Sequence, residues 1–394
     1  MNHLLTRRGF NLHSKQHSDP DSHLGKEQYE TVIIPASSLP TFGAYFTIDY
    51  REINVEIKKL ILQFNISAIS GMTSGMFSPS QFLVNHIDIV QSNNIITTIY
   101  PEEQFIQQQL FECDEDRLLQ NIASGLYSST ALRTTMATTG SFYYLPLWDY
   151  FKTIGNLPIF DQNQSLQLRV FMNPLANCTT GTGTAVATIL SCNLLAKVRR
   201  IHPTESDALK LIVKTKPLHY RFNELKYQSF TVQSGVSTAT LTLTNLVGNI
   251  NLIFFIVRPS SSLIGNAQFN FTAITQYEYL NSAGSNMTGG QPINNSEALL
   301  VLGNDICLSS YLVETALYTV NNGANVYAYT FSKDIINDMI GGQDAGFKPF
   351  FGSEQLKITF ASVLGATHQV DVYAYNSAVL QIDKNGIKKM NYCV

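Results

Sequence analysis

From residue 29 onward, apolar and polar positions alternate in short runs separated by glycine, proline, serine and asparagine, which is typical of β-strands joined by turns. Apolar side chains occupy every second position in residues 45–50 and in residues 166–171. Residues 60–66 are rich in aliphatic side chains, and residues 252–256 form an unbroken apolar run, as buried strands do. Most of the chain after residue 28 is therefore predicted to be β-structure.

One longer segment has the periodicity of a helix instead. Pro101 suits a first helical position, the acidic residues after it suit the positive end of a helix dipole, and apolar residues follow at helical spacing to about residue 124. Shorter helices are predicted at residues 148–154 and 332–340, each followed by a glycine that would end it.

The order of these elements in the first half of the chain is repeated in the second half. A strand around Tyr143, a short helix and an alternating strand at Leu166 correspond to a strand around Tyr327, a short helix and an alternating strand at Leu356. The two tyrosines are 184 residues apart and the two leucines 190, which indicates an internal duplication. Each half has about eight strands, the number in a jelly roll.

The predicted fold class is therefore all-β with short helices, built as two tandem eight-stranded jelly rolls. Residues 1–28 lack apolar periodicity and are predicted to form a flexible N-terminal arm. The first jelly roll is placed at residues 29–200 and the second at residues 218–394. A charged stretch between two prolines, residues 201–217, is interpreted as the linker.

Composition narrows the possible functions. Charged residues make up 14% of the 394 residues, against about 25% in an average soluble domain, and the net charge is −3. A hydrophobic content of 44% excludes an intrinsically disordered chain, and the absence of a positive excess argues against a general nucleic-acid-binding protein. With so few charges, the polar surface is formed mainly by Asn, Thr, Ser and Gln, and it repels other copies of the protein only weakly. Such a surface suits a protein that packs against copies of itself.

The cysteines do not form a recognisable pattern. Their number is odd, and neither CxxC nor a Cys/His ligand spacing occurs, so a disulfide framework or zinc site is not expected, and we infer free thiols in a reducing compartment. No signal peptide or transmembrane helix is expected, because the N-terminus lacks an apolar core and no run of 18 apolar residues occurs. The five cysteines are Cys113, Cys178, Cys192, Cys307 and Cys393.

No segment has the pattern of an active site, and we predict no catalytic, cofactor-binding or metal-binding residues. Residues 181–184 (Gly-Thr-Gly-Thr) lack the lysine of a phosphate-binding loop. His86 and Asp88 would share one face of a strand, but no third ligand is evident. The acidic residues 114–116 are interpreted as a solvated break in the helix. The four histidines of residues 1–28 are assigned to the flexible arm.

Three stretches resemble a known family of viral proteins. Residues 143–148 (Tyr-Tyr-Leu-Pro-Leu-Trp), with the strand at 166–171, are similar to the aromatic-x-Pro-Leu-Pro-aromatic strand and the strand that follows it in the double jelly-roll major capsid proteins, although Trp148 and Asp149 depart from that pattern. Residues 251–258 resemble a second-barrel strand that ends in arginine, and residues 372–392 resemble the closing strand and glycine-containing tail. The family includes proteins of tectivirus-like phages, adenoviruses, virophages, polinton-like viruses and nucleocytoplasmic large DNA viruses.

This resemblance implies a structural role and no enzymatic activity. The protein would be a major capsid protein that forms homotrimers, and these pseudo-hexameric capsomers would tile an icosahedral shell. It would be assembled inside the host cell, reside in the virion, and contact neighbouring capsomers and minor capsid or vertex proteins. The loop-rich segments 70–80, 173–184, 281–296 and 341–352 are expected at the end opposite the chain termini, where some would form outward towers and trimer contacts.

Basic residues gather at three places that a double jelly roll brings to one end. The first and last strands of a jelly roll are antiparallel neighbours, so the N-terminus, the linker and the C-terminus should share one base. We predict that this base contacts an anionic internal membrane or the DNA genome; the alternative is that charge gathers there because chain ends are solvated. The predicted contact residues are Arg7, Arg8, Lys197, Arg199, Arg200, Lys210, Lys214, Lys216, Lys384, Lys388 and Lys389.

Other classes of protein remain open at this point. A two-jelly-roll hydrolase active on glycans, such as a glycan-releasing amidase, would need a close pair of acidic residues between the barrels. A glycan-binding protein with receptor-binding loops and a minor or vertex virion protein are further alternatives. These candidates differ from a major capsid protein in their oligomeric state and in whether many copies of the chain assemble with one another.

Overall fold

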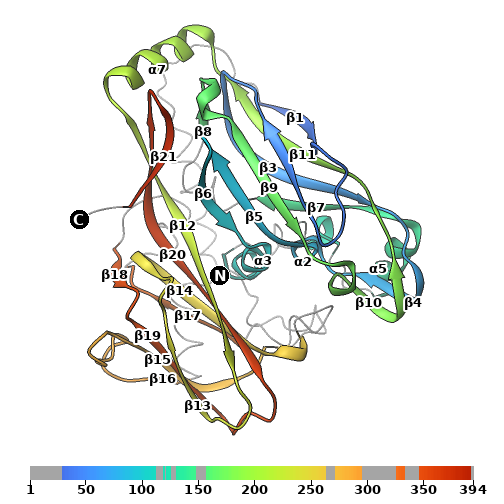
Figure 1. Ribbon diagram of the computed structural model, residues 1–394, viewed down its shortest axis with the longest axis vertical. Coiled ribbons are helices and arrows are strands. Elements are labelled where there is room, and N and C mark those ends of the chain that lie inside the picture. The colour runs from blue at the N-terminus through green and yellow to red at the C-terminus, as the bar shows by residue number, and fades with distance from the viewer. Residues whose placement is uncertain are drawn as a thin grey trace, which may run out of the picture.

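The computed structural model describes residues 29–111, 119, 121–125, 130–147, 157–262, 271–294, 325–332 and 346–391. Figure 1 shows two β-rich halves, one formed by the blue-to-green strands and one by the yellow-to-red strands, with helix α7 lying across one end of the molecule. The helix predicted at 148–154, the helix predicted at 332–340 apart from Ser332, and the residues before 29 lie outside the described part of the chain.

The first half is built from two facing antiparallel sheets. One sheet has the order β1-β11-β3-β7, with β8 also paired to β3, and the other has the order β2-β9-β5-β6. The strands are β1 (Tyr29–Pro35), β2 (Tyr45–Tyr50), β3 (Val55–Ile66), β5 (Val84–Gln91), β6 (Asn94–Ile99), β7 (Ser141–Leu147), β8 (Leu157–Ile159), β9 (Leu166–Met172) and β11 (Ile189–Arg200).

The second half has sheets of the same kind. One has the order β12-β20-β14-β17, with β18 paired to β14 and β21 to β20, and the other has the order β13-β19-β15-β16. The strands are β12 (Leu218–Val232), β13 (Thr238–Thr242), β14 (Val247–Pro259), β15 (Ile274–Leu280), β16 (Ile293–Asn294), β17 (Val326–Thr330), β18 (Lys348–Phe351), β19 (Gln355–Phe360), β20 (His368–Asp383) and β21 (Gly386–Asn391).

Both halves follow one topology. If the eight principal strands of each half are numbered along the chain, one sheet has the order 1-8-3-6 and the other the order 2-7-4-5, in both halves. This is the pairing of a jelly roll and confirms the predicted fold class. The duplication also holds strand by strand, since Tyr143 and Tyr327 lie in the two sixth strands and Leu166 and Leu356 in the two seventh strands.

Two segments expected as loops form a ribbon. Strand β4 (Ser70–Phe77) pairs with β10 (Thr179–Val186), and together they extend the first jelly roll beyond its sheets. Glycine makes this pairing possible, because a Cβ on Gly71 or Gly183 would lie 2.3 Å from a carbonyl oxygen of the facing strand, and both residues have positive φ. The Gly/Thr-rich composition therefore marks close backbone approach here.

The expected positions of two other loops are wrong. Successive antiparallel strands reverse direction, so the connections after the fourth and sixth strands lie on the side where the chain enters the jelly roll. The segment after Leu280 starts beside Gln355, and β18 pairs with the start of β14 at Val247. The described parts of 281–296 and 341–352 therefore lie at the end where the chain enters the second jelly roll, which is the end of the chain termini. Strand β14 ends beside His368, at the opposite end.

The helices fill connections between strands. Helix α2 (Ser80–Leu83) precedes β5, and α3 (Pro101–Phe111) begins at Pro101 as predicted. Helix α5 (Thr130–Thr139) was not expected, because threonine is a weak helix former; its hydroxyls bond to carbonyls one turn back, as Thr135 Oγ1 does to Ala131 at 2.9 Å. Helix α7 (Pro203–Thr215) occupies most of the linker, with Pro203 at its first turn. Short 3₁₀ turns lie at Gln162–Gln164, Leu175–Asn177 and Ser260–Ser262.

The buried apolar residues form three clusters, one centred on each jelly roll and one between the halves. The unbroken apolar run of β14 is explained by burial on both faces: Ile253 and Phe255 point into the second jelly roll, whereas Leu252 and Phe254 pack with Phe105 of α3 in a cluster between the halves. The last third of β20 continues into the core of the first jelly roll through Ala378, Leu380 and Ile382. Each fully buried side chain of this size contributes about 1.5–3 kcal/mol, so the halves stabilise each other.

Candidate functional site

The start of the described chain, the linker and the last hairpin meet at one end of the molecule. Tyr29 pairs with Arg199, Leu218 pairs with Ile382, and the β20–β21 turn follows directly. Helix α7 lies across this end, at one extremity of the long axis (Figure 1). Strand β21 runs back from the end, so the last described residues point away from it. We call this surface, formed by α7 and the β20–β21 turn, the basic end.

Several of the predicted contact residues there are neutralised by carboxylates. Arg199 binds Glu56 at 2.8 Å, and Arg200 binds Glu52 at 3.1 Å and also Glu30. Other ion pairs at or near this end are Arg199–Glu205 at 3.4 Å, Lys210–Asp207 at 3.6 Å, Lys388–Asp383 at 3.1 Å and Lys389–Glu224 at 2.5 Å.

The other predicted contact residues are in different surroundings. Lys197 lies 5.8 Å from the ring centre of Tyr29, in cation–π range. Lys214, Lys216 and Lys384 are exposed and form no ion pair with another described residue. Arg7 and Arg8 lie outside the described residues. The basic end therefore carries fewer unbalanced charges than its sequence suggests, and its proposed contacts stay a prediction.

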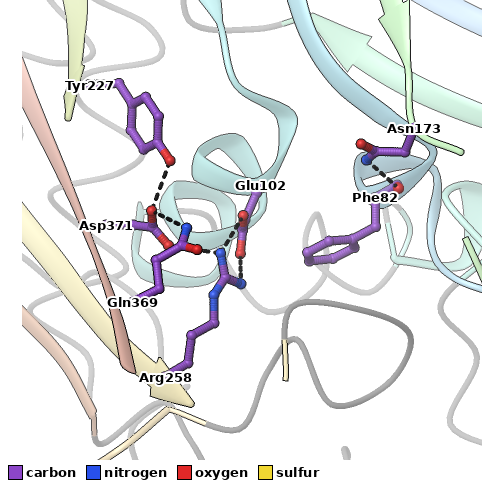
Figure 2. Close-up of polar contacts among 7 residues, drawn as sticks. All are labelled: Phe82, Glu102, Asn173, Tyr227, Arg258, Gln369 and Asp371. Atoms are coloured by element: carbon purple, nitrogen blue, oxygen red, sulfur yellow. Dashed lines mark hydrogen bonds and ion pairs between the residues drawn. The ribbon is translucent and has the colours of Figure 1, made fainter. Parts of the chain in front are cut away.

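A buried polar network joins the two jelly rolls (Figure 2). Arg258, near the end of β14, donates from its Nη2 to Asp371 Oδ2 at 2.8 Å and to Glu102 Oε2 at 3.0 Å, and its Nη1 donates to Glu102 Oε1. Asp371 Oδ1 accepts from the Tyr227 hydroxyl at 2.8 Å and from the Gln369 amide at 2.7 Å. Glu102 belongs to α3 of the first jelly roll, and the other four residues belong to the second.

The network is shielded from water. The side chain of Asp371 is fully buried and that of Arg258 is 5% exposed. Burial disfavours the charge on Arg258, but Glu102 and Asp371 outweigh it and raise the pKa of the guanidinium. Burial and the neighbouring Asp371 raise the pKa of Tyr227 well above its usual value. The guanidinium thus stays charged, and Tyr227 stays protonated as a hydrogen-bond donor.

A small cavity of about 220 Å³ opens beside this network, and both jelly rolls line it. The first contributes Phe82, Tyr100 and Asn173, whose amide donates to the Phe82 carbonyl oxygen at 2.9 Å. The second contributes Tyr227, Arg258 and Gln369. A glycan-active hydrolase would need an acid and a base free to exchange protons here. Glu102 and Asp371 both bind the guanidinium of Arg258.

The side chains of the other candidate pair, His86 and Asp88 on β5, have different contacts. His86 stacks on Phe171 with ring centres 4.1 Å apart, whereas Asp88 accepts a hydrogen bond from Thr98 at 2.7 Å. Among the described residues, no cluster of His, Cys, Asp and Glu could hold a metal ion, and no helix is long and apolar enough to span a membrane. Cys178 and Cys192 are free and buried. The acidic residues 114–116 and the histidines before residue 29 lie outside the described part.

Sequence reasoning missed the network, although a signal existed. Glu102 was interpreted only through the helix dipole and Arg258 only as the end of a strand. Asp371 and Arg258 both adjoin long apolar stretches, and a charge placed in a buried strand needs a partner. Two opposite charges in such settings predict a buried pair. The choice of Glu102 as the third member depends on how α3 docks.

The sequence matches no protein-family model and no curated protein. Its fold, however, is similar to solved structures of viral capsid proteins. PBCV-1 VP54, in the crystal structure fitted into a cryo-EM reconstruction of the virophage Sputnik, has a TM-score of 0.70 at 11% identity and covers 94% of this chain and 98% of its own. For the Faustovirus major capsid protein the TM-score is 0.60 at 10% identity, with 96% and 98% covered.

The mavirus major capsid protein has a TM-score of 0.52 at 11% identity, with 96% of this chain and 94% of that chain covered. These matches extend over nearly the whole of each protein, so both jelly rolls and their arrangement are shared. At such low identity the similarity establishes the fold. The chain has the double jelly-roll fold of these viral capsid proteins.

Proposed function

We propose that this protein is a major capsid protein of an icosahedral virus. The observation that carries the proposal is the pair of jelly rolls with identical strand order in one chain, joined by a shared core and the Arg258 network. A rigid tandem pair gives each subunit two similar sides. Three subunits in cyclic symmetry would then present a pseudo-hexagonal outline, and such tiles fill a flat facet.

The proposal includes the domain division and the place of the protein in the particle. Residues 29–200 and 218–394 act as the two jelly rolls, residues 201–217 as the linker, and residues 1–28 as an arm. The protein forms homotrimers that contact neighbouring capsomers and minor capsid or vertex proteins, is assembled inside the host cell and resides in the virion. It has no catalytic activity. The basic end faces the particle interior, toward an internal membrane or the DNA genome.

Native mass by light scattering after gel filtration tests this proposal. A stable species of about three times 43.9 kDa is expected, followed by flat sheets or closed shells in electron microscopy at high concentration. A monomer at micromolar concentration would contradict it. That outcome would favour a glycan-active or glycan-binding protein, which can be examined by screening glycopeptides against the intact chain.

A further inference from the structure

Helix α7 exposes aliphatic side chains at the outermost point of the basic end. Its inner face is held by Val213, which is buried, and by Ser206, whose hydroxyl bonds to Asn54 at 2.5 Å. Leu211 and Ile212 are exposed to solvent over 65% and 44% of their surfaces. A helix that covers a protein end needs only one apolar face, so these two residues require a separate explanation.

The charges on α7 are separated along its length. The acidic residues lie in its first half and are bound by neighbouring cations, Asp207 by Lys210 and Glu205 by Arg199. The second half carries exposed Lys214 and is followed by Lys216. Lys384, in the turn between β20 and β21, is exposed at the same end. The exposed aliphatic side chains thus have unbalanced positive charge around them.

We infer that the second half of α7 binds an anionic lipid bilayer, with Leu211 and Ile212 entering the headgroup–acyl boundary and Lys214, Lys216 and Lys384 facing the headgroups. An interfacial helix combines these two features: apolar side chains that insert, and lysines that bind anionic lipid. A nucleic acid would use the lysines alone, because aliphatic side chains gain nothing against a phosphate backbone. The exposed leucine and isoleucine therefore favour a bilayer.

The position of α7 fits a flat partner. The helix lies across the end of the long axis, so a planar surface can reach it without meeting either jelly roll first (Figure 1). The inference rests on the proposed function in one respect, namely that the bilayer lies inside the viral particle. Binding itself depends on α7 and can be measured on the isolated protein.

Co-flotation with phosphatidylcholine vesicles containing about a third phosphatidylserine, at an ionic strength of about 0.05 M, tests the inference. L211S/I212S should weaken binding at least tenfold through lost insertion, and K214Q/K216Q should weaken it by about fivefold for each lysine. Val363, a 60% exposed apolar residue in the loop before β20, supplies the matched control, and V363S should bind as the wild type does.

A tryptophan placed at the contact reports insertion directly. The L211W variant should show a blue shift of emission, and quenching by brominated lipid, when vesicles are added; the wild type, with its single tryptophan at 148, supplies the background. Binding that depends on the lysines but not on Leu211 and Ile212, and that duplex DNA reproduces, would overturn the inference in favour of a nucleic-acid contact. A blue-shifted L211W spectrum without vesicles would also overturn it, because a second copy or residues 1–28 would then cover the helix.

The native mass of each variant separates this inference from the proposed function. A trimer that does not float with vesicles refutes the bilayer contact alone. A monomer that floats refutes the capsomer proposal and leaves the bilayer contact supported.

Discussion

Arg258 connects the two jelly rolls, and replacing it by leucine should loosen them from each other. The Arg258→Leu variant removes one guanidinium that binds Glu102 of α3 and Asp371 of β20. It leaves the fully buried Asp371 carboxylate with Tyr227 and Gln369 as its side-chain donors among the described residues.

The magnitude follows from burial. Removing one partner of a buried pair costs about 3–5 kcal/mol, because the remaining charge has no compensation. Asp371 is fully buried, so the effect should fall in this range, whereas Glu102 is 23% exposed and can regain water. Glu102→Gln should therefore cost less than Arg258→Leu. Arg258→Leu combined with Asp371→Asn should be more stable than the single variant, because no charge is then left unpaired.

Urea unfolding followed by far-UV circular dichroism and by tyrosine fluorescence would measure this effect. The wild type should unfold in one transition, and Arg258→Leu should unfold at lower urea with the two probes no longer coincident. Arg51→Leu is the matched control: its ion pair with Asp49 spans 3.0 Å, but the arginine is 81% exposed, so a change below about 0.5 kcal/mol is expected. An Arg258→Leu variant as stable as this control would refute the reasoning.

Three further predictions concern single groups. Burial alone would raise the pKa of Glu224, but Lys226 and Lys389 outweigh burial and lower this pKa. The stability that this cluster contributes is therefore complete above the unfolded-state pKa of about 4.3, and it is lost as the pH falls through the lower pKa of the native state. Glu224→Gln should make the thermal midpoint less dependent on pH between about pH 5 and 3; an unchanged dependence would contradict the assignment. Burial raises the pKa of Cys178 to about 12, so iodoacetamide at neutral pH should modify it only after unfolding, as peptide mass spectrometry would reveal; rapid labelling of the native protein would count against its burial. The Glu354 carboxylate accepts hydrogen bonds from three consecutive backbone N–H groups in the turn between β18 and β19. Glu354→Ala should therefore lower the free energy of unfolding, measured by urea titration, by about 2–3 kcal/mol. An unchanged free energy of unfolding would mean that water replaces all three bonds.

The repeat of the strands in the two halves of the chain could be predicted from the sequence, because strand periodicity is a local property. Alternation at residues 45–50 and 166–171 depends only on which side chains face the core, and it appears as β2 and β9. The repeat of Tyr143 by Tyr327 reflects the same strand in each jelly roll. These local signals were sufficient to predict an all-β double jelly roll.

Other features depend on contacts between distant segments, and only the tertiary structure decided them. Arg258 is 156 residues from Glu102 and 113 from Asp371 in the chain, so no spacing rule connects them. The ribbon of β4 and β10 joins two glycine-rich segments that resemble loops when each is considered alone.

By itself, then, the sequence determined most of the jelly-roll strands, the duplication and the placing of basic residues near the chain ends. The tertiary structure decided which of those charges are balanced by carboxylates, and it showed that residues 203–215 form a helix on which Leu211 and Ile212 are exposed. The physical reason is that side-chain periodicity is set within a few residues, whereas charge pairing and exposure depend on which surfaces the folded chain brings together.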